Sequence, residues 1–344
     1  MSLLSVRDLS VEFATRDGVV RAVNAVSFEV RPGQVLALLG ESGSGKSVTL
    51  RSVLGLHPPA RTRVTGRVLL KGQDVNQVDE RARRDLRGGV VSMVFQEPMT
   101  ALDPVYTIGR QIEETLVEHR GLDRAAARRR ARELLDLVQV PSPERCLASY
   151  PHEISGGMRQ RAMIAIALAG EPELLLADEP TTALDVTVQA QILWLLRDLQ
   201  RRLGLAVIFV THDLGVAAEI ADDAAVMYGG RIVEHAPVRE LFRAPAHPYT
   251  EGLMQATVRR GQKGRPLVPI PGAPPNLVAL PPGCAFAPRC PHVKPLCVDT
   301  PPPLHAVAPG HGARCHLVSE RFASSVGVLA GPASPSVTYK GGSS

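Results

Sequence analysis

A glycine-rich octapeptide, GESGSGKS at residues 40–47, has the pattern G-x-x-x-x-G-K-[ST]. It follows an apolar run typical of a buried strand, residues 35–39, and precedes a segment with helical character, residues 48–56. Glycines let backbone N–H groups approach phosphate oxygens, and a helix start adds donors and the positive end of its dipole. In such a loop Lys46 reaches the β- and γ-phosphates and the Ser47 hydroxyl ligates Mg²⁺. The pattern predicts a nucleotide-binding loop consisting of Gly40, Glu41, Ser42, Gly43, Ser44, Gly45, Lys46, Ser47 and Val48.

Two adjacent acids stand where another apolar run ends, in LLLADE at residues 174–179. Ligands of open α/β sheets bind at the carboxyl ends of strands, so we expect both acids to face the phosphates. Asp178 would hold Mg²⁺, through a water molecule, and Glu179 would act as the general base that polarises the attacking water. Alone, the pair is most simply a polar stop after a core strand. The phosphate loop upstream favours the catalytic interpretation.

Four of the five cysteines fall within 32 residues: Cys284, Cys290, Cys297 and Cys315. In a chain without a visible secretory signal, such a cluster suggests metal ligation before disulfides. The spacing contains no C-x2-C pair, so it does not resemble the usual zinc knuckles. Four thiolates in a proline-rich loop suit either Zn²⁺ or a [4Fe–4S] cluster, and unliganded thiols are the third alternative.

The elements that must position these groups alternate along the chain. Residues 174–177 and 206–210 are apolar runs typical of buried strands, and Ile192, Leu195, Leu196 and Leu199 repeat at helical spacing between them. Strand, helix and strand in this order predict a parallel sheet with crossover helices. Residues 3–30 predict an antiparallel β portion before the first helix, and Gly229-Gly230 predicts a hairpin.

The rest of the chain divides by composition. Residues 110–150 are polar and helical, with Asp123 as an N-cap. Fourteen of the 29 prolines lie between residues 266 and 309, together with the clustered cysteines. Because proline excludes helix interiors and central strands, this stretch predicts a separate loop-rich module. We expect the small and polar tail, residues 321–344, to be disordered.

Overall composition excludes several classes of protein. With 344 residues, 44% of them hydrophobic and 21% charged, the chain is typical of a soluble protein of two domains. The longest nearly apolar run, residues 162–170, is too short to span a bilayer, and no secretory signal is visible, so we expect a cytoplasmic location. A net charge of +5 and 4% aromatic residues do not favour a nucleic-acid partner.

Further motifs resemble those of the ATP-binding-cassette (ABC) ATPases. ISGGMRQR at residues 154–161 resembles the family's signature motif, and residues 182–185 resemble its aspartate loop. Gln96 in VFQEP matches the glutamine loop, His212 in THD matches the switch histidine, and Phe13 lies where the family stacks an aromatic ring on adenine. These motifs occur in family order from residue 3 to about residue 240.

The longer string YPHEISGGMRQRAMIAIAL, with Met158 where the wider family has glutamine, is similar to one subfamily. This is the D-type ATP-binding subunit of oligopeptide, dipeptide and nickel importers. The segment HPYT at residues 247–250 and the proline- and cysteine-rich region after it are similar to the subfamily's C-terminal extension. The resemblance implies an α/β P-loop ABC ATPase core with an antiparallel β subdomain and an α-helical subdomain, plus a small loop-rich C-terminal domain. The expected bounds are 1–255 for the core, about 97–168 for its helical subdomain and 256–320 for the C-terminal domain.

The resemblance also implies roles for single residues. It implies that ATP is bound by the phosphate loop and Phe13, and that Mg²⁺ is held by Ser47, Gln96 and Asp178. The implied catalytic residues are Lys46, Gln96, Glu179 and His212. The implied contacts to ATP of a facing subunit come from Ser155, Gly156, Gly157 and Asp185. The four clustered cysteines would hold a [4Fe–4S] cluster, with Zn²⁺ as the alternative.

The expected function is that of an ATPase that energises peptide import by nucleotide-driven dimer closure. Its expected partners are two transmembrane permease subunits, a second ATP-binding subunit in a heterodimer, and an extracytoplasmic substrate-binding protein. The expected location is the cytoplasmic side of the inner membrane, as a peripheral subunit. The alternatives are a nickel importer of the same subfamily, a soluble ABC-type ATPase that acts on DNA or ribosomes, and a regulator without turnover.

Overall fold

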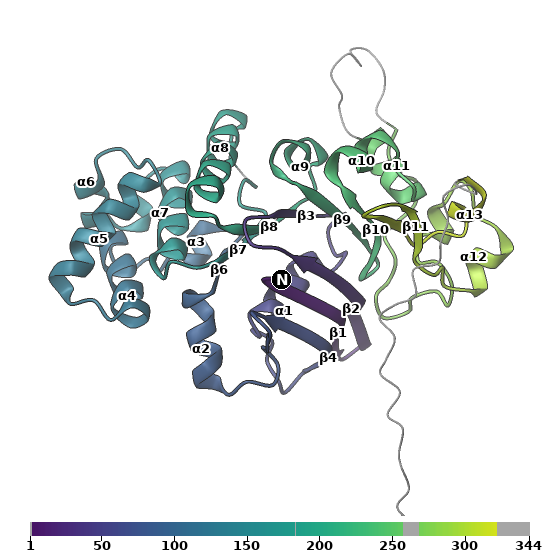
Figure 1. Cartoon of the computed structure of the whole chain (residues 1–344), viewed down its shortest axis with the longest axis horizontal. Helices are drawn as coiled ribbons and strands as arrows, with labels where there is room; N and C mark the ends of the chain where they lie inside the picture. The colour runs from purple at the N-terminus through teal and green to yellow at the C-terminus, as the bar shows by residue number, and fades with distance from the viewer. Residues whose placement is uncertain (1, 183, 257–267, 322–344) are drawn as a thin grey trace, which may run out of the picture.

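The computed structural model describes residues 2–182, 184–256 and 268–321. The tail expected to be disordered thus lies outside the described residues, except for its first position. Figure 1 shows a large sheet across the middle of the molecule, a second sheet below it, a group of helices to the left and the C-terminal region to the right.

The larger sheet has the strand order β11-β12-β10-β9-β3-β8-β7-β6. Its strands are β3 (Val35–Leu39), β6 (Val91–Val94), β7 (Leu174–Asp178), β8 (Ala206–Thr211), β9 (Asp223–Tyr228), β10 (Arg231–Pro237), β11 (His305–Ala308) and β12 (His311–Ala313). Strands β6, β7, β8, β3 and β9 are parallel, and β10, β12 and β11 extend the sheet in antiparallel fashion. Strands β3, β7 and β8 are buried along their whole length, because helices and a second sheet cover both faces. The α/β prediction and the hairpin at Gly229-Gly230 are confirmed.

The pairing register sets four strand ends side by side. Leu176 of β7 pairs with Met93 of β6 on one side and with Ile208 of β8 on the other. Ile208 pairs in turn with Leu36 of β3. Because these strands are parallel, their carboxyl ends meet at one edge of the sheet.

The smaller sheet is antiparallel, as predicted for the N-terminal part of the chain. It consists of β1 (Leu4–Thr15), β2 (Gly18–Val30), β4 (Thr62–Leu70) and β5 (Gln73–Asp74), in the order β2-β1-β4-β5. Leu4 and Leu9 of this sheet share one hydrophobic core with Leu36 and Leu38 of β3. This packing holds the smaller sheet against one face of the larger one.

Helices cover the other face and extend away from it, except for the two that begin at Lys46 and Glu80, which share the hydrophobic core of the smaller sheet. The helices of the core are α1 (Lys46–Val53), α2 (Glu80–Gly89), α3 (Pro98–Ala101), α4 (Ile108–Arg120), α5 (Arg124–Leu137), α6 (Pro143–Ala148), α7 (Gly156–Ala169), α8 (Val186–Leu203), α9 (Leu214–Ile220), α10 (Val238–Arg243) and α11 (Pro248–Gln255). Ile192, Leu195, Leu196 and Leu199 of α8 are buried, as their helical spacing predicted. Asp123 caps α5, since its side chain accepts from the Ala126 N–H. No helix in the described parts of the chain is long and apolar enough to cross a membrane.

Helix α1 begins at Lys46, two residues before the start expected from sequence. The residue before it, Gly45, has φ 103°, and its carbonyl accepts from both the Thr49 N–H (2.9 Å) and the Thr49 hydroxyl (2.9 Å). A positive φ at glycine therefore lets the helix start directly at the loop lysine.

The C-terminal region, residues 268–321, packs against the core, and its predicted bounds as a separate domain stay a prediction. Its strand β12 pairs with β10, and Phe286 is buried within the main hydrophobic core. The β9–β10 hairpin would otherwise leave an unpaired strand edge, which short strands of a proline-rich segment can cover. Its remaining elements are short: η2 (Ala287–Arg289), α12 (Pro295–Asp299) and α13 (Val318–Arg321).

Candidate nucleotide-binding site

The loops that follow β3, β6, β7 and β8 bring four groups of predicted residues together. The phosphate loop follows β3, Gln96 follows β6, Asp178 and Glu179 end β7, and His212 follows β8. Figure 1 shows these strands as neighbours in the central sheet. Residues far apart in the sequence thus share one edge because the parallel register aligns their strands.

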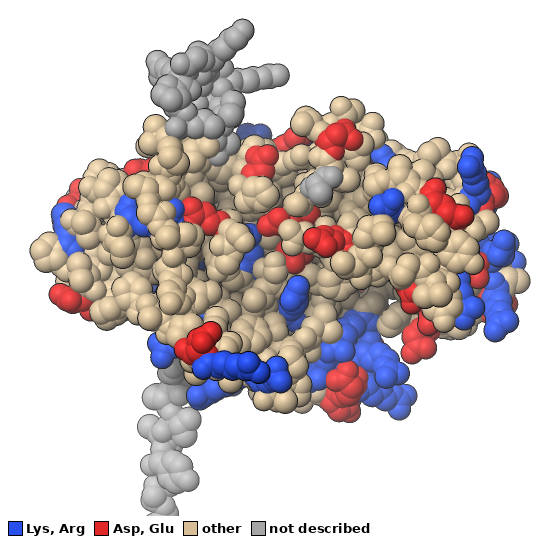
Figure 2. Space-filling model, turned by 180° about the vertical axis from the view of Figure 1, so that it is seen from behind, with Lys and Arg blue, Asp and Glu red and all other residues tan. Residues whose placement is uncertain are grey.

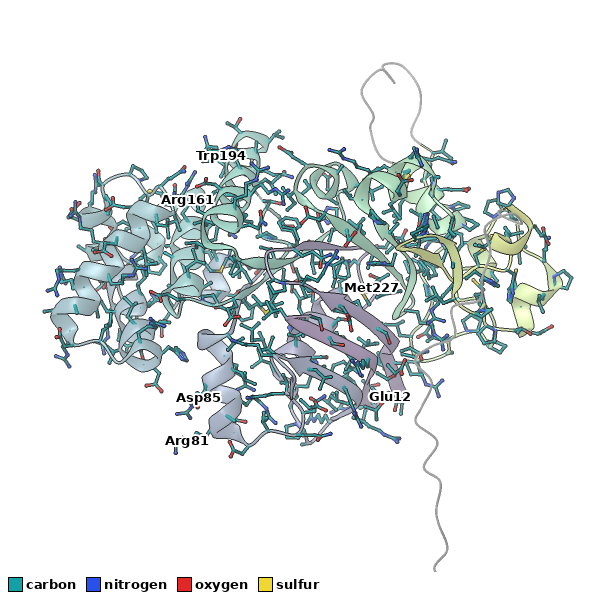
Figure 3. The ribbon with its side chains drawn as sticks, viewed as in Figure 1. Glu12, Arg81, Asp85, Arg161, Trp194 and Met227 are labelled. Atoms are coloured by element: carbon teal, nitrogen blue, oxygen red, sulfur yellow. The ribbon has the colours of Figure 1, made fainter. Side chains whose placement is uncertain are left out.

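The phosphate loop accepts only glycine at two positions. A Cβ on Gly40 (φ 146°) would lie 2.3 Å from the Met227 carbonyl oxygen, and a Cβ on Gly45 would lie 2.4 Å from the Ala22 carbonyl oxygen. Met227 belongs to β9 and Ala22 to β2, so both sheets press on the loop. Figure 3 shows Met227 near the junction of the core with the C-terminal region. At Gly43 (φ 78°) an added Cβ would meet no atom within 4 Å, so that side of the loop is open.

Lys46 lies inside this loop. Its side chain is buried, and Nζ donates to the carbonyl oxygens of Gly40 (2.8 Å) and Glu41 (2.9 Å). Burial lowers the pKa of Lys46, whereas the charges of Glu179, Asp178 and Glu41 raise it. The ammonium group is therefore held at the loop and can turn toward an anion bound there.

The side chains of Ser47 and Asp178 form a pair of hard oxygen ligands. Ser47 Oγ donates to Asp178 Oδ1 at 2.8 Å, and Asp178 is 2% exposed. Burial raises the pKa of Asp178, and the Ser47 hydrogen bond opposes this shift. A buried carboxylate beside a hydroxyl suits Mg²⁺, which binds through a few protein oxygens and keeps several waters. The two predicted ligands therefore fit this ion.

Three side chains converge on one oxygen of Glu179. Its Oε2 accepts from Gln96 Nε2 (3.2 Å) and Thr182 Oγ1 (3.0 Å), and His212 Nδ1 lies 3.5 Å away. Glu179 itself has φ 45°, a backbone conformation that costs energy for a residue other than glycine. Strain at a carboxylate that three elements hold in place is typical of a functional site. The structure places Gln96 on Glu179 and not on the Ser47–Asp178 pair.

Thr182 is a contact that the sequence analysis missed as a partner of Glu179. It appeared only as part of the aspartate loop. Its position three residues after Glu179, within a turn closed by the Thr182 N–H and the Glu179 carbonyl (3.1 Å), is the local signal that could have indicated it.

The signature residues lie at the start of α7. Ser155 caps this helix by accepting from the Met158 N–H at 3.3 Å, and Ser155 and Gly156 are exposed. Asp185 caps α8 in the same way, through the Val188 N–H at 2.9 Å. Within the described parts of the chain, no hydrogen bond or ion pair joins Ser155, Gly156 or Gly157 to the phosphate loop. The contact of these residues with ATP stays a prediction.

Phe13 lies on β1, where its ring meets the edge of the His57 ring at 5.7 Å between centroids. Val11 of the same strand pairs with Val23 of β2, next to the Ala22 carbonyl that abuts Gly45. The smaller sheet therefore places Phe13 on an element that contacts the phosphate loop. Adenine stacking on Phe13 stays a prediction.

The four clustered cysteines come near one another without forming a ligand set. The Cys284 N–H donates to the Cys297 carbonyl oxygen (2.8 Å). Burial, and then the negative charge of the other three thiols, raise the pKa of Cys315 to about 12. Among the described residues, however, no three His, Cys, Asp or Glu side chains are arranged to hold a metal ion. The predicted [4Fe–4S] cluster and its Zn²⁺ alternative are thus not supported by this geometry.

Two further residues that the sequence analysis did not single out contact the phosphate loop from outside the core motifs. Tyr249 Oη accepts from the Glu41 N–H (2.8 Å), and Arg289 donates to the Glu41 carboxylate. A buried arginine in a loop-rich region has no local signal in sequence, because its partner lies 248 positions away.

A phosphate loop at the end of a parallel strand, with an acid pair on the next strand but one, defines a P-loop nucleotide-binding protein. Comparison with known proteins makes this more specific. The ABC transporter family profile matches residues 23–182, and the profile of the oligopeptide/dipeptide transporter C-terminal region matches residues 233–297. The chain belongs to the ABC transporter family, as an ATP-binding subunit.

Relatives cover nearly the whole chain. The dipeptide transport ATP-binding protein DppD of Bacillus subtilis is 47% identical, over 93% of this chain and 96% of its own length. The oligopeptide transport ATP-binding protein OppD of Salmonella typhimurium is 48% identical, over 91% and 93%. Among solved structures, the dimeric ATP-binding cassette MJ0796 in a post-hydrolysis state with ADP and Pi is 28% identical, with a TM-score of 0.62, over 69% of this chain and 99% of that one.

Proposed function

We propose that this chain is the ATP-hydrolysing subunit of a peptide importer. The observation that carries the ATPase proposal is the convergence of Gln96, Thr182 and His212 on Glu179, at the sheet edge that also holds Lys46. The similarity to DppD and OppD, which are named as dipeptide and oligopeptide transport proteins, supports peptides as the cargo.

ATP binding begins at the phosphate loop. The loop N–H groups and the start of α1 take the phosphates, and Lys46 turns from the Gly40 and Glu41 carbonyls to the β- and γ-phosphates. Ser47 and Asp178 would hold a magnesium ion, which would supply positive charge to stabilise the phosphates. Phe13 would stack on the adenine ring.

Hydrolysis depends on Glu179. Its carboxylate takes a proton from a water molecule as the water oxygen bonds to the γ-phosphorus. The bond from that phosphorus to the ADP oxygen breaks, which leaves ADP and phosphate. Gln96, Thr182 and His212 hold the carboxylate in place, and in this role they position the base. His212 is 63% exposed on its side chain, so it can also meet the γ-phosphate.

The exposed start of α7 supports dimer closure. Ser155 and Gly156 present free helix donors to solvent, which is a ready-made anion site. In a facing subunit this site would contact the γ-phosphate, with Asp185 nearby, so ATP joins two subunits and hydrolysis releases them. We propose a second ATP-binding subunit as the partner in a heterodimer, two permease subunits, an extracytoplasmic binding protein, and a peripheral position on the cytoplasmic side of the membrane.

Arginines cluster at residues 81–87 and 124–130, but several of these charges are already paired, which does not favour DNA as the partner. Arg83 and Arg87 of α2 donate to backbone carbonyls and to Glu80, and Arg130 pairs with Glu133 and Glu171. Figure 2 shows basic side chains gathered at the lower end of the molecule, with a few acidic side chains among them. ATPase activity stimulated by DNA, and not by permease with peptide-binding protein, would overturn the transport proposal.

Glu179→Gln tests the catalytic assignment. We expect turnover to fall at least a hundredfold, because removal of a general base costs about 10²–10⁴ in rate. ATP-dependent dimers should accumulate in size-exclusion chromatography with the proposed partner. Glu173→Gln is the matched control: it makes the same change at the other end of β7, at an exposed residue paired with Lys71. Unchanged turnover in Glu179→Gln would show that Glu179 is not the base.

We also propose that the cysteine module binds a metal centre, [4Fe–4S] before Zn²⁺. The support is the sequence, which places four cysteines in a region poor in regular structure, two of them, Cys297 and Cys315, buried. The four thiols are not arranged as a ligand set in the structure, so metal binding requires their side chains to move. Thiolates that repel one another are stabilised by a bound cation. Anaerobic purification followed by an absorbance scan near 400 nm and metal analysis tests this. A colourless protein with one zinc overturns the cluster, and a metal-free protein overturns both. Cys146→Ser, which alters an isolated buried thiol, is the control.

A further inference from the structure

One arginine of the C-terminal region, Arg289, contacts the phosphate loop directly. Arg289 ends η2, and its side chain is 5% exposed. Nη1 donates to Glu41 Oε2 at 2.6 Å and Nη2 donates to Glu41 Oε1 at 3.0 Å. This is a bidentate, charge-assisted pair, which is the strong form of such an interaction. It joins the C-terminal region directly to the second residue of the phosphate loop.

All three polar groups of Glu41 are engaged. Its carboxylate accepts from Arg289, its N–H donates to Tyr249 Oη at 2.8 Å, and its carbonyl oxygen accepts from Lys46 at 2.9 Å. Arg289 is itself fixed, since Nε donates to the Pro271 carbonyl (2.9 Å) and Nη1 to Tyr228 Oη (3.2 Å). When Lys46 turns to the phosphates, Arg289 and Tyr249 remain to hold the loop.

The negative charge of the Glu41 carboxylate is unfavourable in a loop that binds a triphosphate. Its charge acts on Lys46, since Glu41 is one of the groups that raise the pKa of that lysine. An unpaired carboxylate here would repel ATP at the same place. The guanidinium of Arg289 cancels this charge, and the pairing with Glu41 raises the pKa of Arg289 in turn.

A second contact strengthens the link. The Arg21 N–H of β2 donates to the Leu277 carbonyl (3.0 Å), and residues 274–277 line one side of a cavity of about 280 Å³ whose other side is residues 41–44. The C-terminal chain therefore runs along the outside of the phosphate loop before it returns to Arg289.

We propose that Arg289 is a positioning residue of the ATP site: it neutralises Glu41 and fixes the entry of the phosphate loop, so the C-terminal region sets the affinity of the core for ATP. This inference rests on the proposed ATPase function. Arg289 acts through Glu41, without contact with the reacting atoms.

The test measures kcat and KM for ATP on the full chain, with the unfolding midpoint of each variant. Arg289→Met should raise KM about tenfold and change kcat less than about twofold, because a charge near the phosphates affects ground-state and transition-state binding alike. Adding Glu41→Gln to Arg289→Met should bring KM back to within about threefold of wild type, since the repelling carboxylate is then gone. Arg289→Lys keeps the positive charge but cannot form the bidentate pair, so its KM should lie between those of wild type and Arg289→Met.

The outcomes separate this inference from its alternatives. A raised KM that Glu41→Gln does not reverse, in variants with the wild-type unfolding midpoint, overturns the neutralising role. If Arg289→Met does not fold, Arg289→Lys decides: a wild-type KM overturns the need for the bidentate pair. Arg314→Met is the control and should leave KM unchanged, because Arg314 is a partly buried arginine of the same region that forms no hydrogen bond or ion pair with Glu41 in the described structure. A wild type that neither binds nor hydrolyses ATP overturns the proposed function itself, whereas equal KM values in wild type and Arg289→Met overturn only the role of Arg289.

Discussion

Burial affects the protonation of single residues near the end of the core. His247 is an example: it is fully buried, its Nδ1 accepts from the Tyr249 N–H (3.0 Å), and its Nε2 has no hydrogen-bond partner. Burial lowers the pKa of His247 to about 4, although the nearby Glu234 opposes the shift. The residue that starts α11 is therefore neutral in the folded protein at neutral pH.

This burial predicts a pH dependence of stability. Between pH 6.5 and pH 4 the unfolded chain binds a proton at His247 and the folded chain does not, so stability falls as the pH falls through this window. We expect the free energy of unfolding to drop by about 2 kcal/mol from pH 7 to pH 5 through this residue. Urea unfolding at both pH values measures it. His247→Asn keeps a capping acceptor without a titrating group, so the drop should shrink by this amount; an equal drop in both proteins would contradict the assignment.

At the scale of elements, helix starts serve two purposes in this fold. Asp123 starts α5 and Ser155 starts α7, and each side chain accepts from the N–H three residues later. Both helices belong to the helical group on the left of Figure 1, but only α7 carries the signature residues. Both helix starts have the same type of side-chain cap. A comparison of the two can therefore distinguish the structural role of a cap from a role in anion binding.

Matched substitutions test this difference. Asp123→Ala and Ser155→Ala should each lower the free energy of unfolding by about 1 kcal/mol, which is the usual cost of a lost cap. Only Ser155→Ala should lower ATP turnover in the assembled dimer, because in the proposed dimer only that helix start would face the γ-phosphate of ATP bound to the partner. ATPase assays beside thermal unfolding distinguish the two effects. Similar turnover in both variants would mean that Ser155 only caps its helix.

At the scale of the whole molecule, one buried acid joins three segments. Glu234 of β10 is fully buried and accepts from the Ala246 N–H (2.7 Å), the His247 N–H (3.0 Å) and His311 Nε2 (2.8 Å) of β12. These contacts tie the end of the core to the C-terminal strands. They help to hold the proline-rich region against the sheet.

Removal of the Glu234 carboxylate should lower the stability of the whole protein. Glu234→Ala leaves three buried donors without an acceptor, so we expect the free energy of unfolding to fall by about 3–5 kcal/mol. Glu240→Ala, which breaks the exposed pair with Arg243, should change it by less than about 0.5 kcal/mol. Denaturant unfolding of both variants is the measurement, and a loss below 1 kcal/mol in Glu234→Ala would contradict the joining role.

The sequence by itself determined the groups whose chemistry depends on neighbours along the chain. The phosphate loop needs a strand, glycines and a helix start within about 20 residues, and the acid pair needs only the end of strand β7. Local backbone geometry sets these features, so composition and spacing were sufficient to predict roles for Lys46, Ser47, Asp178 and Glu179.

Only the tertiary structure decided which side chains meet. Gln96 and His212 reach Glu179 because β6, β7 and β8 are aligned neighbours, and Arg289 reaches Glu41 across 248 positions because the C-terminal chain turns back along the phosphate loop. Burial of apolar surface and the pairing of strand edges determine the course of the C-terminal chain. These are cooperative properties of the whole chain, and no local pattern of residues records them.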